Sequence, residues 1–514
     1  MKKRELTANQ NIALNLIASF ISYAITFGIS FFLSPYIVKT VGVDAYGFVS
    51  LANNFISYAS IITIALNSFA GRFVTIKIRN NDYAAANRYY TSVFYGNVII
   101  ASVLFAVAVF VWIFLEKLIN IPDDIFWDVK ILFAAIFLEC IINIVGTVFS
   151  IATFATNKLY LSQIRNIEAS VLRAVLLVVM FSFCPAKVFY LGITTMIIAL
   201  YTIAFNVYYT CKLTPKLKIQ KKYFDFKAIK ELVSSGIWNV VTRLGQILND
   251  GLDLLITNLF IDSTAMGVLS LAKTVPSIIG SIIGTMVSSF SPNFTILYAE
   301  NKLDELNLAV KQSMKIMGVI SNVPIVILIV CGKKFFACWQ PTQDAQTLEI
   351  LSILTCAGYI VNGGINCIYN IFTVVNKPKP NSLVILAGSV VSIGTTFILL
   401  KTTDFGIYAI AGVSTLVSII RNLFFTVPYG AKCLNLKWYA FYPEVLRSVI
   451  FVVLNSFINY FIISKIDGSG WINFILCSIL TGIISLLLGV YIIFNKEDRK
   501  YLHLKLKDMI SRFN

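Results

Sequence analysis

The chain has 514 residues, of which 58% are hydrophobic and only 13% are charged, and its formal net charge is +17. Soluble domains are about half apolar and about a quarter charged, so this composition excludes most soluble enzymes. It also excludes disordered chains, which have low hydrophobicity. The apolar residues come in blocks of about 20 residues, the length that a helix needs to cross the hydrocarbon core of a bilayer. The sequence therefore predicts a membrane protein.

Fourteen apolar blocks follow one another along the chain, separated by short polar stretches. Their approximate bounds are 12–33, 47–69, 91–115, 129–150, 167–183, 187–210, 233–260, 263–290, 313–331, 348–373, 381–400, 405–427, 444–464 and 471–494. We predict an all-α polytopic membrane protein with about fourteen transmembrane helices.

Basic residues alternate between the loops of this predicted topology. Most of the 42 Lys and Arg residues fall before the first block, in every second loop and after the last block. Cytoplasmic loops of membrane proteins carry such an excess of Lys and Arg. A nucleic-acid-binding protein would instead gather them on one soluble face. We therefore expect both termini in the cytoplasm and no nucleic-acid partner.

Motifs that would indicate a metal site, a cofactor or an active site are absent from the sequence. The single histidine is His503, and the nine cysteines include no Cys-x-x-Cys pair. No G-x-x-x-x-G-K-[ST] phosphate-binding loop occurs. The loops expected outside the cell are too short for a glycosyl-transfer or ligase domain. We therefore expect no metal, no cofactor and no enzymatic activity.

An internal repeat predicts how the helices are grouped. A shift of 220 positions aligns 47–52 with 267–272, and identities continue to Asn87 and Asn307. Duplicated halves are typical of transporters, although chance agreement between two Ser- and Ile-rich helices is the alternative. We predict two parallel six-helix lobes plus two C-terminal helices. The expected parts are an N-terminal lobe at 1–210, a basic cytoplasmic linker at 211–232, a C-terminal lobe at 233–430, and the last two spans with a basic cytoplasmic tail at 431–514.

Polar side chains recur at helical spacing within several blocks. In block 233–260 they are Asn239, Arg243, Gln246, Asp250, Asp253 and Thr257, which fall on one face of a helix. Asn53 in the second block and Ser277 in the eighth belong to similar faces. We expect these faces to line a water-filled cavity between the lobes. The alternative is that the hydroxyl and amide groups join neighbouring helices.

Charged residues inside the blocks are the strongest functional signal, because intramembrane charges usually face a cavity or a partner. Arg243 and Lys273 fall near mid-membrane, and a bound anion is favoured over pure ion pairing. A diphosphate suits them, because Arg forms bidentate bonds to phosphate oxygens and Lys acts as a point charge. The intramembrane acids Asp250, Asp253 and Glu139 are candidates for ion coupling, with structural pairing as the alternative. Arg173 is expected either to pair with Glu168 or to reach the interface.

The chain resembles the polysaccharide transporter family, the Wzx-type oligosaccharide-lipid flippases of the multidrug/oligosaccharidyl-lipid/polysaccharide exporter superfamily. The resemblance rests on the basic N-terminus and on Val41-Gly42-Val43-Asp44-Ala45-Tyr46-Gly47 before the second span. It also rests on the repeated counterpart Asp262-Ser263-Thr264-Ala265-Met266-Gly267, where Met266 replaces the usual tyrosine. The resemblance covers nearly the whole chain.

This resemblance implies a flippase of the bacterial inner membrane that works by alternating access. Its cargo would be undecaprenyl-diphosphate-linked oligosaccharide repeat units for O-antigen (lipopolysaccharide), capsule or exopolysaccharide assembly. The resemblance also implies coupling to an H⁺ or Na⁺ gradient. The partners it implies are the surrounding membrane lipids and the polysaccharide polymerase machinery. Family members have a cationic central cavity, for which Arg243, Lys273, Arg421 and Arg72 are the candidates by position.

Three other functions remain open at this point. A lipid II flippase and a drug/cation antiporter belong to the same superfamily, but an antiporter is expected to have an acid-dominated cavity. A polytopic sugar polymerase or ligase represents a different class and would need a large outer loop.

Overall fold

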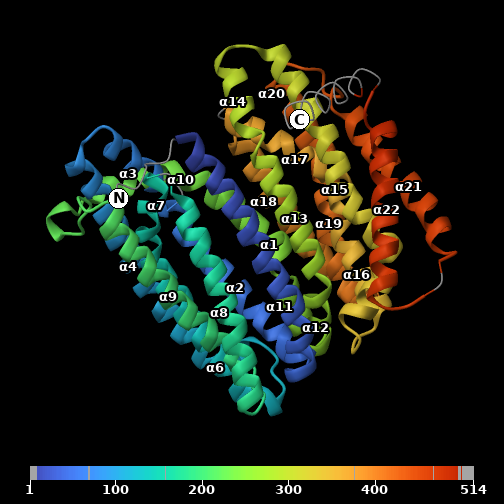
Figure 1. Ribbon diagram of the computed structural model, residues 1–514, viewed down its shortest axis with the longest axis horizontal. Coiled ribbons are helices and arrows are strands. Elements are labelled where there is room, and N and C mark those ends of the chain that lie inside the picture. Colours follow the sequence, from blue (N-terminus) through green and yellow to red (C-terminus); the bar gives the residue numbers. More distant parts are fainter. Residues whose placement is uncertain are drawn as a thin grey trace, which may run out of the picture. The chain divides into compact units, whose positions relative to one another are not determined.

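The computed structural model describes residues 8–67, 70–156, 158–375, 377–466, 468–495 and 499. Every regular element in these ranges is helical (Figure 1). Thirteen helical segments are long and apolar enough to cross a membrane, among the residues that the structure describes. The remaining predicted block, 233–260, is also helical but carries charged residues along its length. The prediction of an all-α membrane protein with about fourteen spans is confirmed.

The chain divides into two compact units, of which unit 1 comprises Met1–Ile247 and Leu254–Gly267. Its helices are α1 (Ala8–Val41), α2 (Val43–Asn67), α3 (Ala70–Arg79), α4 (Tyr83–Ile113), α5 (Leu115–Leu118), η1 (Asp123–Ile125), α6 (Phe126–Gly146), η2 (Thr147–Ser150), α7 (Ile151–Ala155), α8 (Leu159–Phe183), α9 (Phe189–Leu213), η3 (Lys221–Tyr223) and α10 (Phe226–Gln246). Helix α6 packs against α9, α1 against α8, and α10 against α2 and α4. The unit therefore extends beyond the linker 211–232 at which the sequence predicts the lobes to divide.

Unit 2 comprises Leu248–Asp253 and Val268–Asn514. Its helices are α13 (Thr274–Ser288), α14 (Ser291–Ala299), α15 (Leu303–Trp339), α16 (Ala345–Cys356), α17 (Gly358–Val374), α18 (Lys379–Thr402), α19 (Ile407–Arg421), η5 (Asn422–Thr426), α20 (Val427–Cys433), α21 (Tyr442–Ile463) and α22 (Trp471–Ile492). The long helix α15 packs against α16, α17, α21 and α22 and supplies much of the buried core. The division between the units falls within η4 (Ile247–Gly251), α11 (Asp253–Phe260) and α12 (Ser263–Ala272).

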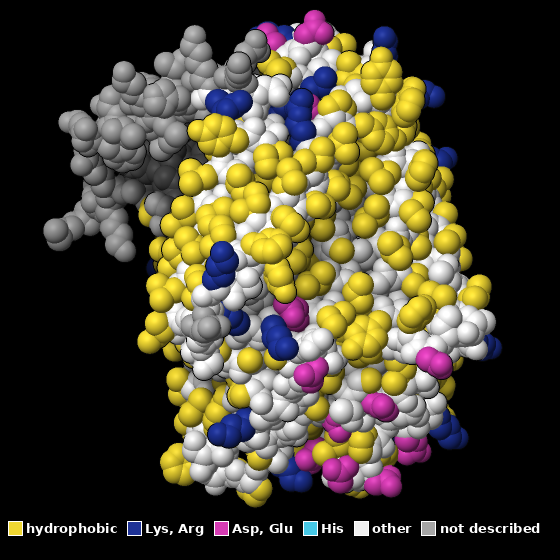
Figure 2. Space-filling model, turned by 90° about the vertical axis from the view of Figure 1, so that its right-hand side faces the viewer, with side chains coloured by type: hydrophobic (Ala, Val, Ile, Leu, Met, Phe, Trp, Pro, Cys, Tyr) yellow, Lys and Arg dark blue, Asp and Glu magenta, His cyan; other side chains and the backbone are white. Residues whose placement is uncertain are grey.

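Helices α21 and α22 present large apolar side chains on the surface. Phe457 is 63% exposed, Ile472 is 78% exposed and Leu476 is 61% exposed. The face of the molecule on the side of these helices is covered largely by hydrophobic side chains (Figure 2). A soluble protein rarely exposes so much contiguous apolar surface, so these helices are suited to contact with lipid tails.

The same helix-ending motif occurs at two positions that the internal repeat aligns. Asn81 and Asn301 both have a φ of 57°, a left-handed conformation that asparagine tolerates better than most residues. In each case the next residue donates its amide to the carbonyl five positions earlier, at 3.0 Å after Asn81 and 2.9 Å after Asn301. This is the hydrogen bond of a Schellman cap. Identical caps at aligned positions support a true duplication.

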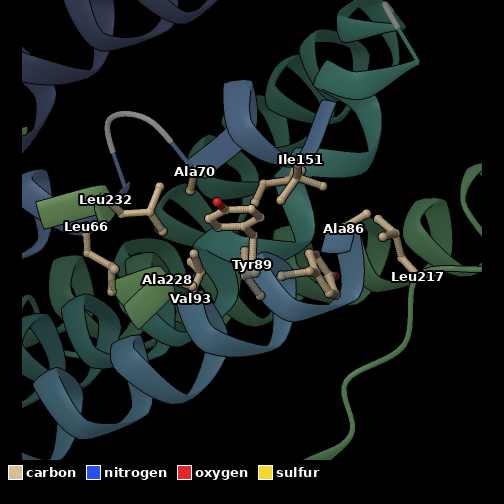
Figure 3. Close-up of a cluster of buried hydrophobic side chains, with 12 residues drawn as sticks. Leu66, Ala70, Ala86, Tyr89, Val93, Ile151, Leu217, Ala228 and Leu232 are labelled. Carbon is tan, nitrogen blue, oxygen red and sulfur yellow. The ribbon is translucent and has the colours of Figure 1, made fainter. Parts of the chain in front are cut away.

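The basic segment 211–232 is part of unit 1 and packs against its other helices. Leu217, Ala228 and Leu232 are buried in a hydrophobic cluster with residues of α2, α3, α4 and α7 (Figure 3). The side chain of Asn87 in α4 binds the segment on both sides of Leu217: it donates to the carbonyl of Lys216 at 3.2 Å and accepts from the amide of Lys218 at 2.8 Å. Most of the lysines of the segment stay exposed, so it combines an apolar anchor with a basic surface.

Two glycines that the repeat aligns meet at a close helix crossing. A Cβ atom on Gly47 of α2 would lie 2.8 Å from Cα of Gly267 of α12. A Cβ atom on Gly267 would lie 2.4 Å from the carbonyl oxygen of Val43. Both obstacles are backbone atoms, which have no rotamer through which to move aside. The two helices can therefore approach this closely only because both positions are glycine.

We expect Gly267→Ala to destabilise the protein by about 1–3 kcal/mol, because overpacking at a close contact costs that much. The measurement is the melting temperature of the purified protein in detergent. Gly284→Ala in α13 is the matched control, because nothing lies within 4 Å of a Cβ atom at that position. Equal melting temperatures for Gly267→Ala and the wild type would contradict the close crossing.

Candidate functional site

The polar stripe of the seventh span lies on an interrupted helix. Helix α10 ends at Gln246, the backbone continues through the π-helical segment η4, and α11 begins at Asp253. A π-helical turn widens the helix and is common at functional sites. The interruption falls among the polar residues that the sequence singles out, so it changes the directions in which they point relative to a continuous helix.

Arg243 lies in the last turn of α10 and is half-buried. Its Nη1 donates a long hydrogen bond of 3.4 Å to Oε1 of Gln246, which is itself exposed. No ion pair of Arg243 with an acid occurs among the described residues. Among the described residues the guanidinium therefore uses one of its five N–H donors in a long hydrogen bond to a neutral group.

Lys273 is held by an acid. It lies between α12 and α13, and its Nζ is 2.5 Å from Oδ2 of Asp253 at the start of α11. The side chains of Lys273 and Asp253 are only 18% and 10% exposed. The structure thus pairs Lys273, which the sequence predicts to bind substrate, with Asp253, which it predicts to take part in ion coupling. For Lys273 this geometry corresponds to the ion-pairing alternative.

Arg421 belongs to a network of neutral polar groups in unit 2. Its Nη2 donates to the hydroxyl of Tyr369 at 3.4 Å and to that of Ser418 at 3.2 Å. Asn422 extends the network, because its Oδ1 accepts from Tyr369 at 2.6 Å and its Nδ2 donates to Asn362 at 2.7 Å. The Nε of Arg421 is buried without a hydrogen-bond partner. No carboxylate takes part in this network among the described residues, so the partners of Arg421, like that of Arg243, are neutral.

Asn53 lines a cavity of about 190 Å³ inside unit 1, formed by α1, α2, α8 and α9. Arg173 of α8 lines the same cavity. Glu168 does not pair with Arg173, because it binds Arg165 and accepts a hydrogen bond of 2.5 Å from Tyr201. The predicted pairing of Arg173 with Glu168 is therefore wrong. The reason is that Arg165 lies one helical turn from Glu168 and also reaches Tyr209.

The other predicted residues have simpler surroundings. Glu139 accepts a hydrogen bond of 2.5 Å from Asn143, one turn later in α6. Ser277 donates to the carbonyl of Lys273 at 2.7 Å, which is a bond within the helix. The side chains of Arg72, Asn239 and Asp250 lie outside the described residues. In the described part of the chain, no group of three His, Cys, Asp or Glu side chains could hold a metal ion.

The residue that sequence reasoning undervalued is Arg173. Its signal was present, because an arginine inside an apolar helix is a functional candidate by default. The signal was discounted because Glu168 was close in sequence. Only the fold shows that α1 and α2 add serine, tyrosine and asparagine side chains around Arg173.

Comparisons with known proteins agree on the family and the fold. Residues 12–297 match the family described as "Polysaccharide biosynthesis protein". The chain is 24% identical over 491 residues to the uncharacterized membrane protein EpsK of Bacillus subtilis (strain 168), covering 95% of this chain and 96% of that protein.

Two groups of solved structures are similar. The lipid II flippase MurJ in its inward closed conformation has a TM-score of 0.67 at 14% identity, covering 93% of this chain and 98% of that chain. A multidrug resistance MATE family transporter of the MOP superfamily, in its inward-facing conformation, has a TM-score of 0.66 at 13% identity, covering 82% of this chain and 98% of that chain. These likenesses show the fold. Because the family match spans more than half of the sequence, the chain belongs to the polysaccharide biosynthesis protein family, and its fold is that of the MATE and MurJ transporters.

Proposed function

We propose that the chain is a flippase that moves undecaprenyl-diphosphate-linked oligosaccharide repeat units across the bacterial inner membrane, with both termini in the cytoplasm. The cargo would serve the assembly of O-antigen, capsule or exopolysaccharide. The observation that carries this proposal is the environment of Arg243 and Arg421. Each arginine lies within or at the end of a membrane-spanning segment, and the hydrogen-bond partners that the structure gives each one are neutral.

An unneutralised arginine inside a span favours an anionic ligand. Charged groups in the bilayer normally pair with one another or face a water-filled pathway. A diphosphate offers oxygens in the geometry that guanidinium binds bidentately. Membership of the polysaccharide biosynthesis family supports a sugar attached to that diphosphate. The exposed apolar side chains of α21 and α22 give a long lipid tail a surface on which to remain in the bilayer.

Lys273 contributes to the proposal in a different way. In the described arrangement its charge is compensated by Asp253 at 2.5 Å. A proton arriving at Asp253 would remove that compensation and release Lys273 for an anion. We therefore propose Asp253 as the first candidate for coupling to an H⁺ gradient. Glu139, which is bound to Asn143, is the second candidate.

Deletion of the gene in its native bacterium tests the function. We expect undecaprenyl-diphosphate-linked single repeat units to accumulate on the cytoplasmic side, and the surface polymer to be lost. The measurement is mass spectrometry of the lipid-linked oligosaccharides. Restoration of the intact gene is the control. Normal polymer with altered drug sensitivity would support an antiporter instead, and accumulation of lipid II would support a peptidoglycan-precursor flippase.

We expect Arg243→Ala to reduce flipping by about ten- to a hundredfold, because a hydrogen bond to a charged group contributes about 1.5–3 kcal/mol. The rate is measured by complementation of the deletion strain, with protein abundance measured in the same cells. Lys221→Ala, at an exposed position of the linker, is the control and is expected to complement fully. Wild-type flipping by Arg243→Ala would refute the proposed contact.

The Lys273–Asp253 pair predicts a double-mutant cycle. Lys273→Ala alone removes the ion-pair partner of the buried carboxylate of Asp253, and the loss of one partner of a buried pair is expected to cost about 3–5 kcal/mol. Adding Asp253→Ala removes that charge, so the double variant is expected to melt above the Lys273→Ala single variant. Thermal melting of the purified proteins measures both effects. Additive losses of stability would show that the two side chains do not interact.

A further inference from the structure

The cavity of about 190 Å³ inside unit 1 has properties that the proposed flippase function does not use. Its lining comes from four helices, α1, α2, α8 and α9, and all of the lining residues lie in unit 1. Neither Arg243 nor Arg421 is among them. The cavity is therefore a separate feature from the arginines proposed to bind the diphosphate.

The lining of this cavity carries one positive charge, on Arg173, together with neutral hydroxyl and amide groups. The lining side chains with polar atoms include Ser30, Tyr46, Asn53, Ser170 and Arg173. Hydroxyl and amide groups can donate to an anion, and guanidinium can only donate. No carboxylate is among the lining residues. Such a lining attracts an anion and repels a cation.

Arg173 itself has unused donor capacity. Its Nε is buried and has no hydrogen-bond partner, which is costly for a charged group in the protein interior. No ion pair of Arg173 occurs in the described part of the chain. Glu139 acts on it electrostatically without forming an ion pair, and the carboxylate of Glu139 is already bound to Asn143. An anion in the cavity could accept the hydrogen bond that Nε of Arg173 does not make within the protein.

Size and charge identify the class of ligand. Pockets that hold drug-sized ligands have volumes of about 300–1,000 Å³, so a cavity of about 190 Å³ suits a small anion with a few waters better than a sugar diphosphate. A single arginine, partly offset by Glu139, compensates one negative charge and would leave a dianion under-compensated. We propose that this cavity is a binding site for a halide ion, chloride under physiological conditions, with Arg173 as its central ligand.

A chloride ion at this position would bridge the helices that line the cavity. Helix α1 packs against α2 and α8, and Thr26 and Ser170 form a hydrogen bond of 2.9 Å beside the site. An anion bound by donors of several helices stabilises the folded state in proportion to its occupancy. Chloride is thus expected to stabilise unit 1, independently of the cargo.

Thermal melting of the full-length protein in detergent tests the site. Sodium chloride is compared with sodium gluconate at equal ionic strength, because gluconate is a bulky organic anion and differs from chloride in both size and shape. Chloride is expected to raise the melting temperature by a few degrees in a saturable manner. Arg173→Gln is expected to abolish the response, and Lys221→Ala to retain it. A response that survives in Arg173→Gln, or equal melting temperatures in the two salts, would overturn the proposal.

A direct measurement and a milder variant keep the test decisive if Arg173→Gln does not fold. Crystals of the wild-type protein soaked in bromide are expected to show anomalous density beside Nε of Arg173. Tyr46→Phe removes one lining hydroxyl and is expected to weaken chloride binding about two- to tenfold, in line with the loss of one hydrogen bond. Tyr23→Phe, at an exposed position of α1, is its control and is expected to bind normally. Absence of bromide density, an unchanged affinity in Tyr46→Phe, or stronger stabilisation by phosphate than by chloride would refute a halide site.

Discussion

The cost of positive charge in a hydrocarbon environment is the constraint on which this structure depends. Every basic side chain inside a span needs compensation by an acid, by neutral donors and acceptors, or by a ligand. The chain uses these solutions at different places. Lys273 is compensated by Asp253 at 2.5 Å, whereas the hydrogen-bond partners of Arg243 and Arg421 among the described residues are neutral. This difference separates Lys273, which has an acidic partner, from the two arginines that we propose to bind an anion.

The same constraint explains where the helices deviate from regularity. The division of the chain between the two units falls at the π-helical segment η4, next to Arg243. A second π-helical segment, η5, follows Arg421 directly. At the close contact between Gly47 and Gly267 the helices depend on the absence of side chains, and no charge is involved. Interruptions and close contacts thus accompany the positions that the proposed function uses, while regular apolar helices such as α22 make up the remainder.

Much of the fold could be predicted from the sequence, because it depends on local properties. Apolar blocks of membrane-spanning length predict the helices, and the 220-residue repeat aligns Asn81 with Asn301, the two positions at which the structure has matching caps. The seventh block was predicted as one continuous span, but its interruption depends on backbone geometry that hydropathy does not report. Its packing with α2 and α4 likewise depends on contacts between segments distant in sequence.

The site was predictable to a smaller extent. Periodicity places Asn239, Arg243 and Gln246 on one face, but it says nothing about which acid approaches which base. Lys273 pairs with Asp253, and Glu168 pairs with Arg165. Both pairings depend on helix packing and on competing partners. Arg173 illustrates the limit, because its cavity is built from four helices and no single segment of sequence contains it.

Recognition of a lipid-linked diphosphate by arginines that no described carboxylate pairs with is the step on which the proposed function depends. It is tested most directly by reconstituting the purified protein in liposomes that contain a fluorescent undecaprenyl-diphosphate oligosaccharide. The measured quantity is the rate at which the fluorophore crosses to the leaflet that a membrane-impermeant quencher can reach. We expect rapid crossing by the wild type, slow crossing by the Arg243→Ala/Arg421→Ala variant, and slow crossing of a carrier with a single phosphate. Equal crossing rates for both proteins and both carriers would contradict this expectation.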